Sequence, residues 1–154
     1  MEIEKKLAAL GLELPAPPKP AAHYIPYVRV GNLLFVGGNT GRLNGEPHAF
    51  AGKVGDKVTL EQGYQMARHC ALNHLAIIKS ALGDLDRVER FVKLIGYVNV
   101  TPGFTRMPVV VNGASDLFIE LWGERGEHAR AAVGVASLAN DAPVETEVIV
   151  QIKE

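Results

Sequence analysis

The sequence predicts an α+β fold in which two long helices cover one face of a mixed β-sheet. Residues 59–82 and 105–122 have apolar positions at helical spacing. Residues 26–30, 33–38 and 88–100 are instead rich in the β-branched and aromatic side chains that are typical of strands. Along the chain we expect three strands, a helix, a strand, a helix and two strands, an order that favours helices packed on one face of the sheet.

The first 22 residues (1–22) are predicted to extend a single domain formed by residues 23–154. Residues 2–10 repeat apolar positions as a short amphipathic helix does, and Gly11 ends this helix. The prolines within residues 15–22 favour an extended, polyproline-like arm. We expect this arm to lie across the fold as a spacer. The alternative is a ligand for a proline-reading domain.

Turns that contain glycine are predicted at several points between residues 31 and 45. Gly31 and Asn32 separate the first two strands, and Asn44 with Gly45 marks a further tight turn. Residues 37–41 (Gly-Gly-Asn-Thr-Gly) are glycine-rich, but they lack the spacing of a dinucleotide-binding or phosphate-binding loop. They predict either a tight bend or a backbone that closely approaches a ligand.

The first long helix has clear signals at both ends. Thr59 can cap it, Gln62 completes a capping box, and Gly83 ends it. The second helix, residues 105–122, ends before Gly123. The apolar stripe of the first helix consists of Leu60, Tyr64, Ala67, Ala71, Leu75, Ile78 and Leu82.

The C-terminal segment 130–151 predicts a β-hairpin that turns at residues 139–143. In this hairpin Glu145 would pair near Ser137, which is about seven strand residues from Arg130. At about 3.3 Å per residue, more than about 20 Å would separate Glu145 from Arg130. One small molecule could not touch both charges within one chain. If both line one cleft, they must come from different subunits.

The two charges of this segment suit a site for small carboxylic acids. A fixed guanidinium such as that of Arg130 can hold a carboxylate, and Glu145 can move protons beside it. The structural alternative is that Arg130 is a solvated charge at a strand end. Glu145 and Glu147, which alternate with Val144 and Thr146, would then form the wet face of a sheet.

The predicted sheet carries more apolar side chains than two helices can cover. Covering one such side chain is worth about 1.5–3 kcal/mol, so several left in water would cost much of a domain's stability. We therefore expect the sheet to pack against copies of itself. The side chains that lead to this expectation are Phe91, Val92, Leu94, Ile95, Val98, Val133, Val135 and Val148.

Composition bounds the possible partners and location. The 154 residues fit one domain, and a net charge of −1 gives no electrostatic footprint for nucleic acid. No apolar run approaches a membrane span, and residues 1–6 lack a secretory apolar core. The single cysteine fits a reducing cytosol. We therefore expect a cytoplasmic protein, and the charge and hydropathy predict that it binds neither nucleic acid nor membrane.

No metal or cofactor site is expected. His69 and His74 are five residues apart, about 140° around a helix, so they cannot share a metal as an i, i+4 pair does. Cys70 lies in the middle of the first long helix and is expected to be a small buried hydrophobe. Ser115 occurs outside any nucleophile-elbow context.

Several motifs together point to a known family. These are residues 24–38 (Tyr-Ile-Pro-Tyr-Val-Arg-Val-Gly-Asn-Leu-Leu-Phe-Val-Gly-Gly), Asn112, 128–130 (His-Ala-Arg) and 144–147 (Val-Glu-Thr-Glu). In this order they resemble the RidA (YjgF-type) family of reactive-intermediate deaminases over residues 24–152. The resemblance implies a chorismate-mutase-like homotrimer, in which three sheets form a central barrel with clefts between subunits. It also implies hydrolysis of 2-imino acids, such as those released by pyridoxal-phosphate dehydratases, to 2-keto acids and ammonia, with no cofactor.

The same resemblance implies the roles of individual residues. Arg130 matches the arginine that grips the substrate carboxylate, and Glu145 matches the glutamate near the reactive carbon. Tyr24 matches a tyrosine that lines the cleft, and Asn112 matches an asparagine near the second helix. Ala132 falls where the family often has a cysteine, whose backbone contacts the substrate.

Two further positions bear on whether the chain is active. Gly37 falls where characterised deaminases commonly have serine, and Gly38 follows it, so backbone groups would contact the substrate here. The N-terminal 21 residues resemble a longer branch of the family.

The expected partners are other copies of the chain and a small carboxylate or imino acid. Non-catalytic binding or sensing of small carboxylates is the first alternative, and an endoribonuclease is the second.

Overall fold

The computed structural model describes residues 1–154, which form three α-helices and five β-strands. The helices are α1 (Glu2–Ala9), α2 (Leu60–Leu82) and α3 (Met107–Trp122). The strands are β1 (Tyr27–Val30), β2 (Leu33–Thr40), β3 (Val88–Asn99), β4 (Ala129–Val135) and β5 (Val144–Ile152). Short 3-10 helices occur at η1 (Leu85–Arg87), η2 (Gly123–Gly126) and η3 (Ala139–Asp141). None of the helices combines the length and the apolar character that crossing a membrane requires.

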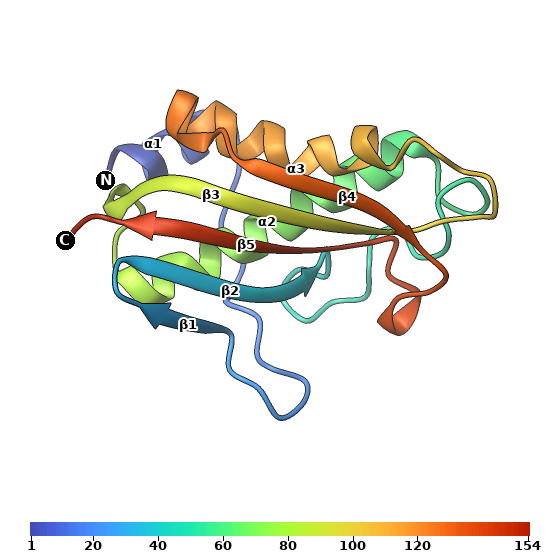
Figure 1. Cartoon of the computed structure of the whole chain (residues 1–154), viewed down its shortest axis with the longest axis horizontal. Coiled ribbons are helices and arrows are strands. Elements are labelled where there is room, and N and C mark those ends of the chain that lie inside the picture. The colour runs from blue at the N-terminus through green and yellow to red at the C-terminus, as the bar shows by residue number, and fades with distance from the viewer.

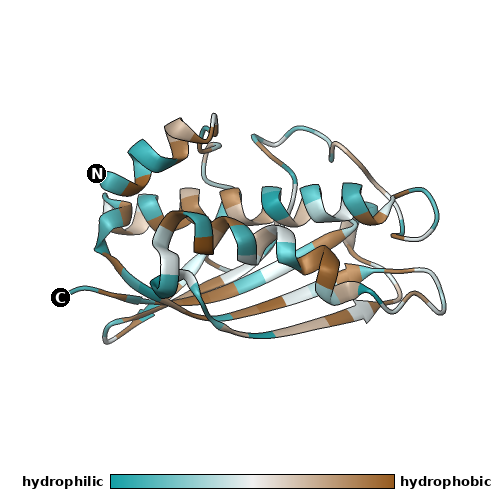
Figure 2. Ribbon diagram, turned by 90° about the horizontal axis from the view of Figure 1, so that it is seen from above, coloured by the Kyte–Doolittle hydropathy of each residue, from teal (hydrophilic) through white to brown (hydrophobic).

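The five strands form a single mixed sheet in the order β1-β2-β5-β3-β4 (Figure 1). β3 and β4 run parallel, and the other neighbouring pairs run antiparallel. The helices all lie on one side of the sheet, and the chain leaves the opposite face uncovered (Figure 2). The predicted α+β class, with two long helices on one face of a mixed sheet, is confirmed.

The predicted C-terminal hairpin is wrong, because β3 lies between β4 and β5. Leu94 in the middle of β3 pairs with Arg130 on one side and with Val148 on the other. Helix α3 carries the chain from the end of β3 back to the start of β4, which is the crossover that a parallel pair requires. Glu145 therefore pairs with Tyr97 of β3, and not with Ser137.

The expected third strand before the first long helix is also absent. Between Thr40 and Leu60 the backbone makes only isolated bridges, from Val54 to Val58 and to Val100. The tight turn predicted at Asn44 and Gly45 does form, with both residues at positive φ (54° and 72°). This segment is consequently a long loop at one end of the sheet.

Helix α2 forms because its end signals are realised. The Thr59 hydroxyl accepts a hydrogen bond from Gln62 N at 3.1 Å, and Thr59 N donates to the Gln62 side chain at 3.0 Å. Gly83 ends the helix in the left-handed region at φ 82°. At Gly113 a Cβ would lie 2.0 Å from the Tyr64 carbonyl, so α2 and α3 touch through their backbones. This contact packs α3 against α2, and α3 also packs on β3 and β4.

The N-terminal segment packs on the rest of the molecule. Ile3 and Leu7 of α1 are buried in the same hydrophobic core as the two long helices. The Asp86 carboxylate accepts hydrogen bonds from the backbone N–H groups of Glu2 and Ile3, at 2.7 and 2.9 Å, and so caps α1. The proline-containing arm that follows passes behind the strands from α1 and then loops beside β1 and β2 (Figure 1).

The uncovered sheet face carries a band of apolar side chains. Val28, Phe35 and Ile149 pair in one row across β1, β2 and β5. Val28 and Phe35 are 48% and 41% exposed, and a contiguous exposed apolar patch of this kind marks an interaction surface. Of the apolar sheet residues that were predicted to exceed what the helices can cover, some are buried under the helices and the others are exposed. The helices bury Phe91, Leu94, Val98 and Val148, while Val92, Ile95, Val133 and Val135 remain partly or largely exposed.

Candidate functional site

The residues singled out in the sequence fall into two groups at different places on the sheet. Tyr24, Gly37, Gly38 and Glu145 lie on the β2 and β5 side and form the acidic half-site. Arg130, Asn112 and Ala132 lie around β4 and α3 and form the arginine half-site. The structure brings together the members of each group, but within one chain it does not bring the two groups together.

Glu145 is the charged centre of the acidic half-site. Its side chain lies on the uncovered face of β5, half-buried, and no side chain of the protein pairs with it. Burial, reinforced by the charge of Glu147, raises the pKa of the Glu145 carboxyl above its usual value. Such a carboxyl takes up and releases a proton more readily near neutral pH than an ordinary glutamate does.

Gly38 lets the backbone of β2 approach this carboxyl. A Cβ at Gly38 would lie 3.2 Å from Cδ and 3.3 Å from Oε2 of Glu145. The register of β2 and β5 shifts between Val36 and Asn39, so Gly38 sits in a bulge opposite Glu145. Gly37 is less constrained, since a Cβ there would meet only the Pro26 carbonyl, at 3.6 Å.

A cleft of about 450 Å³ opens beside Glu145. Its walls come from β2, the turn at Asn44 and Gly45, and the proline-containing arm at residues 16–21. Tyr24 lines the cleft and accepts a hydrogen bond from Ala21 N at 3.3 Å, which ties the end of the arm to the start of the domain. The volume falls in the range of small-molecule sites.

Arg130 is the centre of the arginine half-site. One of its terminal nitrogens donates to Asn112 Oδ1 at 2.7 Å and to Ser115 Oγ at 3.1 Å, and the other donates to the Pro108 carbonyl at 3.2 Å. These acceptors all lie in α3, so the helix fixes the guanidinium. Three of its five N–H donors are used, and two remain for a ligand.

Ser115 and His128 extend this network, and sequence reasoning assigned neither of them to the site. His128 Nδ1 lies 2.6 Å from the Gly126 carbonyl, which fixes the proton on Nδ1. Nε2 therefore accepts from the Ser115 hydroxyl at 2.9 Å, and the Ser115 oxygen accepts from Arg130. Burial lowers the pKa of His128 below its usual value, so the imidazole is neutral at pH 7.

Ala132 and Asn112 take their places through the packing of α3 on the sheet. Ala132 follows Arg130 by two residues on β4, on the same face, and pairs with Gly96 of β3. A Cβ at Gly96 would lie 2.5 Å from the Val111 side chain, so α3 packs closely on the sheet here. The packing brings Asn112, the next residue of α3, against Arg130.

The two half-sites face opposite sides of the sheet. Arg130 pairs with the buried Leu94 and points toward α3, whereas Glu145 pairs with Tyr97 on the uncovered face. Three residues along β3 and two strand spacings separate their Cα atoms by about 14 Å. This separation is shorter than the more than about 20 Å that the predicted C-terminal hairpin implied. The backbone of the sheet nevertheless lies between the two side chains.

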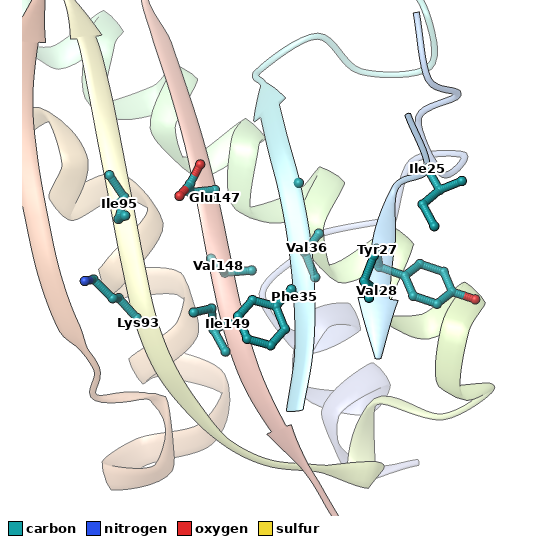
Figure 3. Close-up of a pocket in the computed structure, with 11 residues that line it drawn as sticks. Ile25, Tyr27, Val28, Phe35, Val36, Lys93, Ile95, Glu147, Val148 and Ile149 are labelled. Carbon is teal, nitrogen blue, oxygen red and sulfur yellow. The ribbon is translucent and has the colours of Figure 1, made fainter. Parts of the chain in front are cut away.

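A shallow groove of about 280 Å³ crosses the uncovered face (Figure 3). Phe35 and Ile149 lie next to each other at its floor, and Lys93 flanks Ile149 on β3. Glu147 lies toward its end nearer Glu145. This groove is apolar where the cleft beside Glu145 is polar, so the two features suit different occupants.

The other candidate residues are interior. His74 is fully buried, and its Nε2 lies 2.7 Å from Thr146 Oγ1. Burial lowers the pKa of His74 to about 4. Cys70 is fully buried, as predicted, and burial raises the pKa of its thiol.

Comparison with known proteins identifies the relatives of the chain. A family model described as "YjgF/chorismate mutase-like, putative endoribonuclease" matches residues 4–143. The chain is 43% identical over 151 residues to "Protein TCP17" of Trypanosoma cruzi, covering 97% of this chain and 94% of that protein.

Solved structures extend this likeness. The protein Atu1372 of Agrobacterium tumefaciens, whose function is described as unknown, is 44% identical with a TM-score of 0.91 over 99% of this chain and 94% of that chain. A "putative endoribonuclease" of Shewanella oneidensis is 31% identical with a TM-score of 0.94 over 99% of this chain and 100% of that chain. RidA of an Antarctic Psychrobacter species is 26% identical with a TM-score of 0.60, covering 88% and 93%. The chain belongs to the YjgF/chorismate-mutase-like family, the RidA-type proteins.

Proposed function

We propose that this protein hydrolyses 2-imino acids to 2-keto acids and ammonia in clefts formed between copies of the chain. The observation that carries the proposal is the pair of incomplete half-sites on one sheet. The arginine half-site offers a fixed cation with free donors, and the acidic half-site offers an unpaired carboxyl with a raised pKa. Each lacks what the other provides.

The arginine half-site suits the carboxylate that every 2-imino acid carries. Two N–H donors of Arg130 remain after its contacts with α3. Hydrogen bonds from a charged donor to a carboxylate contribute about 1.5–3 kcal/mol each. Because α3 already fixes the guanidinium, little side-chain entropy is lost when the ligand binds.

The acidic half-site suits the proton transfers of imine hydrolysis. A water oxygen forms a bond to the imine carbon, and Glu145 accepts a proton from this water. Glu145 returns this proton to the imine nitrogen, which gives the neutral carbinolamine. Glu145 then takes the hydroxyl proton of the carbinolamine and passes it to the nitrogen, so the C–N bond breaks and ammonia leaves as the C=O bond forms. Water supplies the keto oxygen and two of the three hydrogens of ammonia, and the imine supplies the third, so the reaction needs no oxidant or cofactor.

The uncovered sheet face supports the assembly that this reaction requires. Val28, Phe35 and Ile149 form an apolar row there, and burying each of them would contribute about 1.5–3 kcal/mol. We propose a homotrimer with the three sheets facing a central barrel. In this arrangement the arginine half-site of one subunit meets the acidic half-site of its neighbour.

Non-catalytic binding of small carboxylates is a second candidate, and Gly37 is the observation that favours it. A glycine at this position offers no hydroxyl to the substrate, whereas the resemblance implies a serine in characterised deaminases. A binder would use the same cleft and the same Arg130 without turnover.

A ribonuclease, the activity named for some relatives, finds less support in the side chains. His74 is fully buried, and both ring nitrogens of His128 are engaged within the protein. Neither of these two imidazoles is free for the acid–base steps of RNA cleavage, and no other histidine lines the cleft beside Glu145 or contacts Arg130.

A coupled assay tests the proposed reaction. A dehydratase acting on serine releases 2-aminoacrylate, which becomes 2-iminopropanoate, and the rate of pyruvate formation is followed with and without the protein. We expect the wild type to accelerate pyruvate formation and Arg130→Ala not to. Arg29→Ala is the control and should accelerate it fully, because the exposed Arg29 guanidinium bonds only to its own turn in the wild type. Binding of pyruvate without acceleration would favour the non-catalytic candidate.

A further inference from the structure

The cleft beside Glu145 contains a feature that the reaction on a small imino acid does not use. Lys19 from the proline-containing arm and Arg42 from the segment after β2 both line it. Neither cation forms an ion pair with a carboxylate of the protein. Two unpaired cations beside a half-buried glutamate form a polar subsite next to the proposed reaction centre.

Arg42 is held in a defined position. Its Nε donates to the Glu46 carbonyl at 2.9 Å and its Nη2 to the Gly45 carbonyl at 2.6 Å. The buried amide of Asn73 donates to the Thr40 and Arg42 carbonyls, at 2.9 and 2.8 Å, and so anchors this segment to α2. Two bonds to its own turn leave three guanidinium N–H donors free.

The arm that carries Lys19 is pinned on both sides of this residue. Ala16 N donates to Asn44 Oδ1 at 2.8 Å, and Ala21 N donates to the Tyr24 hydroxyl at 3.3 Å. The prolines between these contacts fix φ and stiffen the arm. The arm therefore forms a fixed wall of the cleft, and Lys19 is the cation on that wall.

We propose that Lys19 and Arg42 bind a second anionic group of the substrate, so that the preferred substrates are imino acids with an acidic side chain. This inference rests on the proposed function, which puts the reactive carbon at Glu145. With the first carboxylate on Arg130 of a neighbouring subunit, the side chain of the substrate extends into the cleft. The cleft of about 450 Å³ is far larger than a three-carbon acid requires.

Charge balance supports an anion here. Glu145 is the one acidic residue that lines this cleft, and Lys19 and Arg42 are two basic residues of the same lining. In the proposed reaction the α-carboxylate of the substrate is bound by Arg130, outside this cleft. A second carboxylate on the substrate would accept charge-assisted hydrogen bonds from both Lys19 and Arg42. A basic side chain would be repelled by them.

A matched pair of substrates tests the proposal. 2-Iminoglutarate and 2-iminopentanoate have the same five-carbon chain and differ in the second carboxylate; both are generated in place by an amino-acid oxidase. We expect the wild-type assembly to prefer 2-iminoglutarate by at least about tenfold in kcat/KM, which corresponds to one charge-assisted contact. Lys19→Met together with Arg42→Met should reduce this preference to within about twofold. Lys57→Met, an exposed cation away from the cleft, should leave the preference unchanged.

A binding measurement separates this inference from the proposed function. Calorimetry with 2-oxoglutarate and 2-oxopentanoate needs no turnover, and Lys19→Met alone removes a charge from an exposed side chain without touching the core. Tighter binding of 2-oxoglutarate that weakens in Lys19→Met supports the subsite even if no imine is hydrolysed. Equal binding of the two keto acids by the wild type, or equal turnover of the two imines, would overturn it.

Discussion

Arg130 and Glu145 lie on opposite faces of the same sheet, two strands apart. Arg130 turns toward α3, where Asn112 and Ser115 hold its guanidinium, and Glu145 turns toward the uncovered face. No rotamer change can bring the two charges into one pocket of a single chain, because the backbone of the sheet separates them. A site that uses both must therefore draw on two subunits.

Glu145 should govern the pH dependence of turnover. If its carboxylate form accepts the proton from water, kcat falls as the pH drops through its raised pKa. Glu145→Gln should remove most of the activity at every pH. Glu147→Gln removes the like charge that contributes to the raised pKa, so the acid limb of its profile should move to lower pH. An unchanged acid limb in Glu147→Gln would contradict this assignment.

Glu145→Gln should also change how stability depends on pH. The folded protein binds the proton of Glu145 more tightly than the unfolded chain does, so this residue lowers the free energy of unfolding as pH rises from its unfolded pKa through its folded pKa. The variant should therefore melt at a higher temperature than the wild type at pH 7. This advantage should disappear below about pH 4. Thermal melts at both pH values check the sign.

Ser115 should act as a positioning residue for Arg130. Ser115→Ala removes one acceptor from the guanidinium and leaves His128 Nε2 without its donor. Leaving a buried polar group unpaired costs about 1–3 kcal/mol of the free energy of unfolding. Because Arg130 binds the carboxylate before and during the reaction, KM should rise more than kcat falls. Ser80→Ala, an exposed serine on α2, is the control.

Gly37 and Gly38 should respond differently to an added side chain. Gly37→Ser fits, because a Cβ there meets only the Pro26 carbonyl at an ordinary 3.6 Å, so the fold should keep its stability. If the missing hydroxyl limits turnover of small imino acids, this variant should hydrolyse 2-iminopropanoate faster. Gly38→Ala should instead displace the Glu145 carboxyl, which lies 3.2 Å from the new Cβ, and reduce kcat. Equal effects of the two substitutions would be evidence against the role of Gly38.

The apolar row on the uncovered face should hold the assembly together. Phe35→Glu introduces a charge at its centre, and burying that charge without a partner is costly. We expect sedimentation velocity to show monomers and the imine hydrolysis to be lost with the assembly. Ile119→Glu is the matched control, since Ile119 is an equally exposed apolar residue (39%) on the outer surface of α3. Dissociation in both variants, or in neither, would mean that the interface lies elsewhere.

Local features of the fold could be predicted from the sequence, and non-local strand pairing could not. The boundaries of α2 depend on Thr59, Gln62 and Gly83, which act within a few residues of one another, so the prediction was accurate. The turn residues before β5 look the same whether the flanking strands pair or not. β3 separates β4 from β5 because the α3 crossover returns the chain to its far edge, and this depends on packing across the whole domain.

The candidate site divides in the same way. Arg130 and Glu145 could be singled out because a cation and an acid recur at a spacing that resembles a known family. The sequence motif at residues 128–130 includes His128, but the roles of Ser115 and His128 could not be predicted, because their contact exists only once α3 has packed on the sheet. Lys19 likewise carries no signal in the sequence. It becomes part of a cleft only because the arm is pinned at Asn44 and Tyr24.

Mixing two inactive variants tests the central claim most directly. Arg130→Ala and Glu145→Gln are purified separately, mixed in equal amounts, exchanged by dissociation and reassembly, and assayed on 2-iminopropanoate. In a cyclic assembly each cleft takes its arginine half-site from one subunit and its acidic half-site from the next, so about a quarter of the clefts become intact. We predict recovery of about a quarter of wild-type activity. A mixture that exchanges subunits but remains inactive would contradict a site shared between chains.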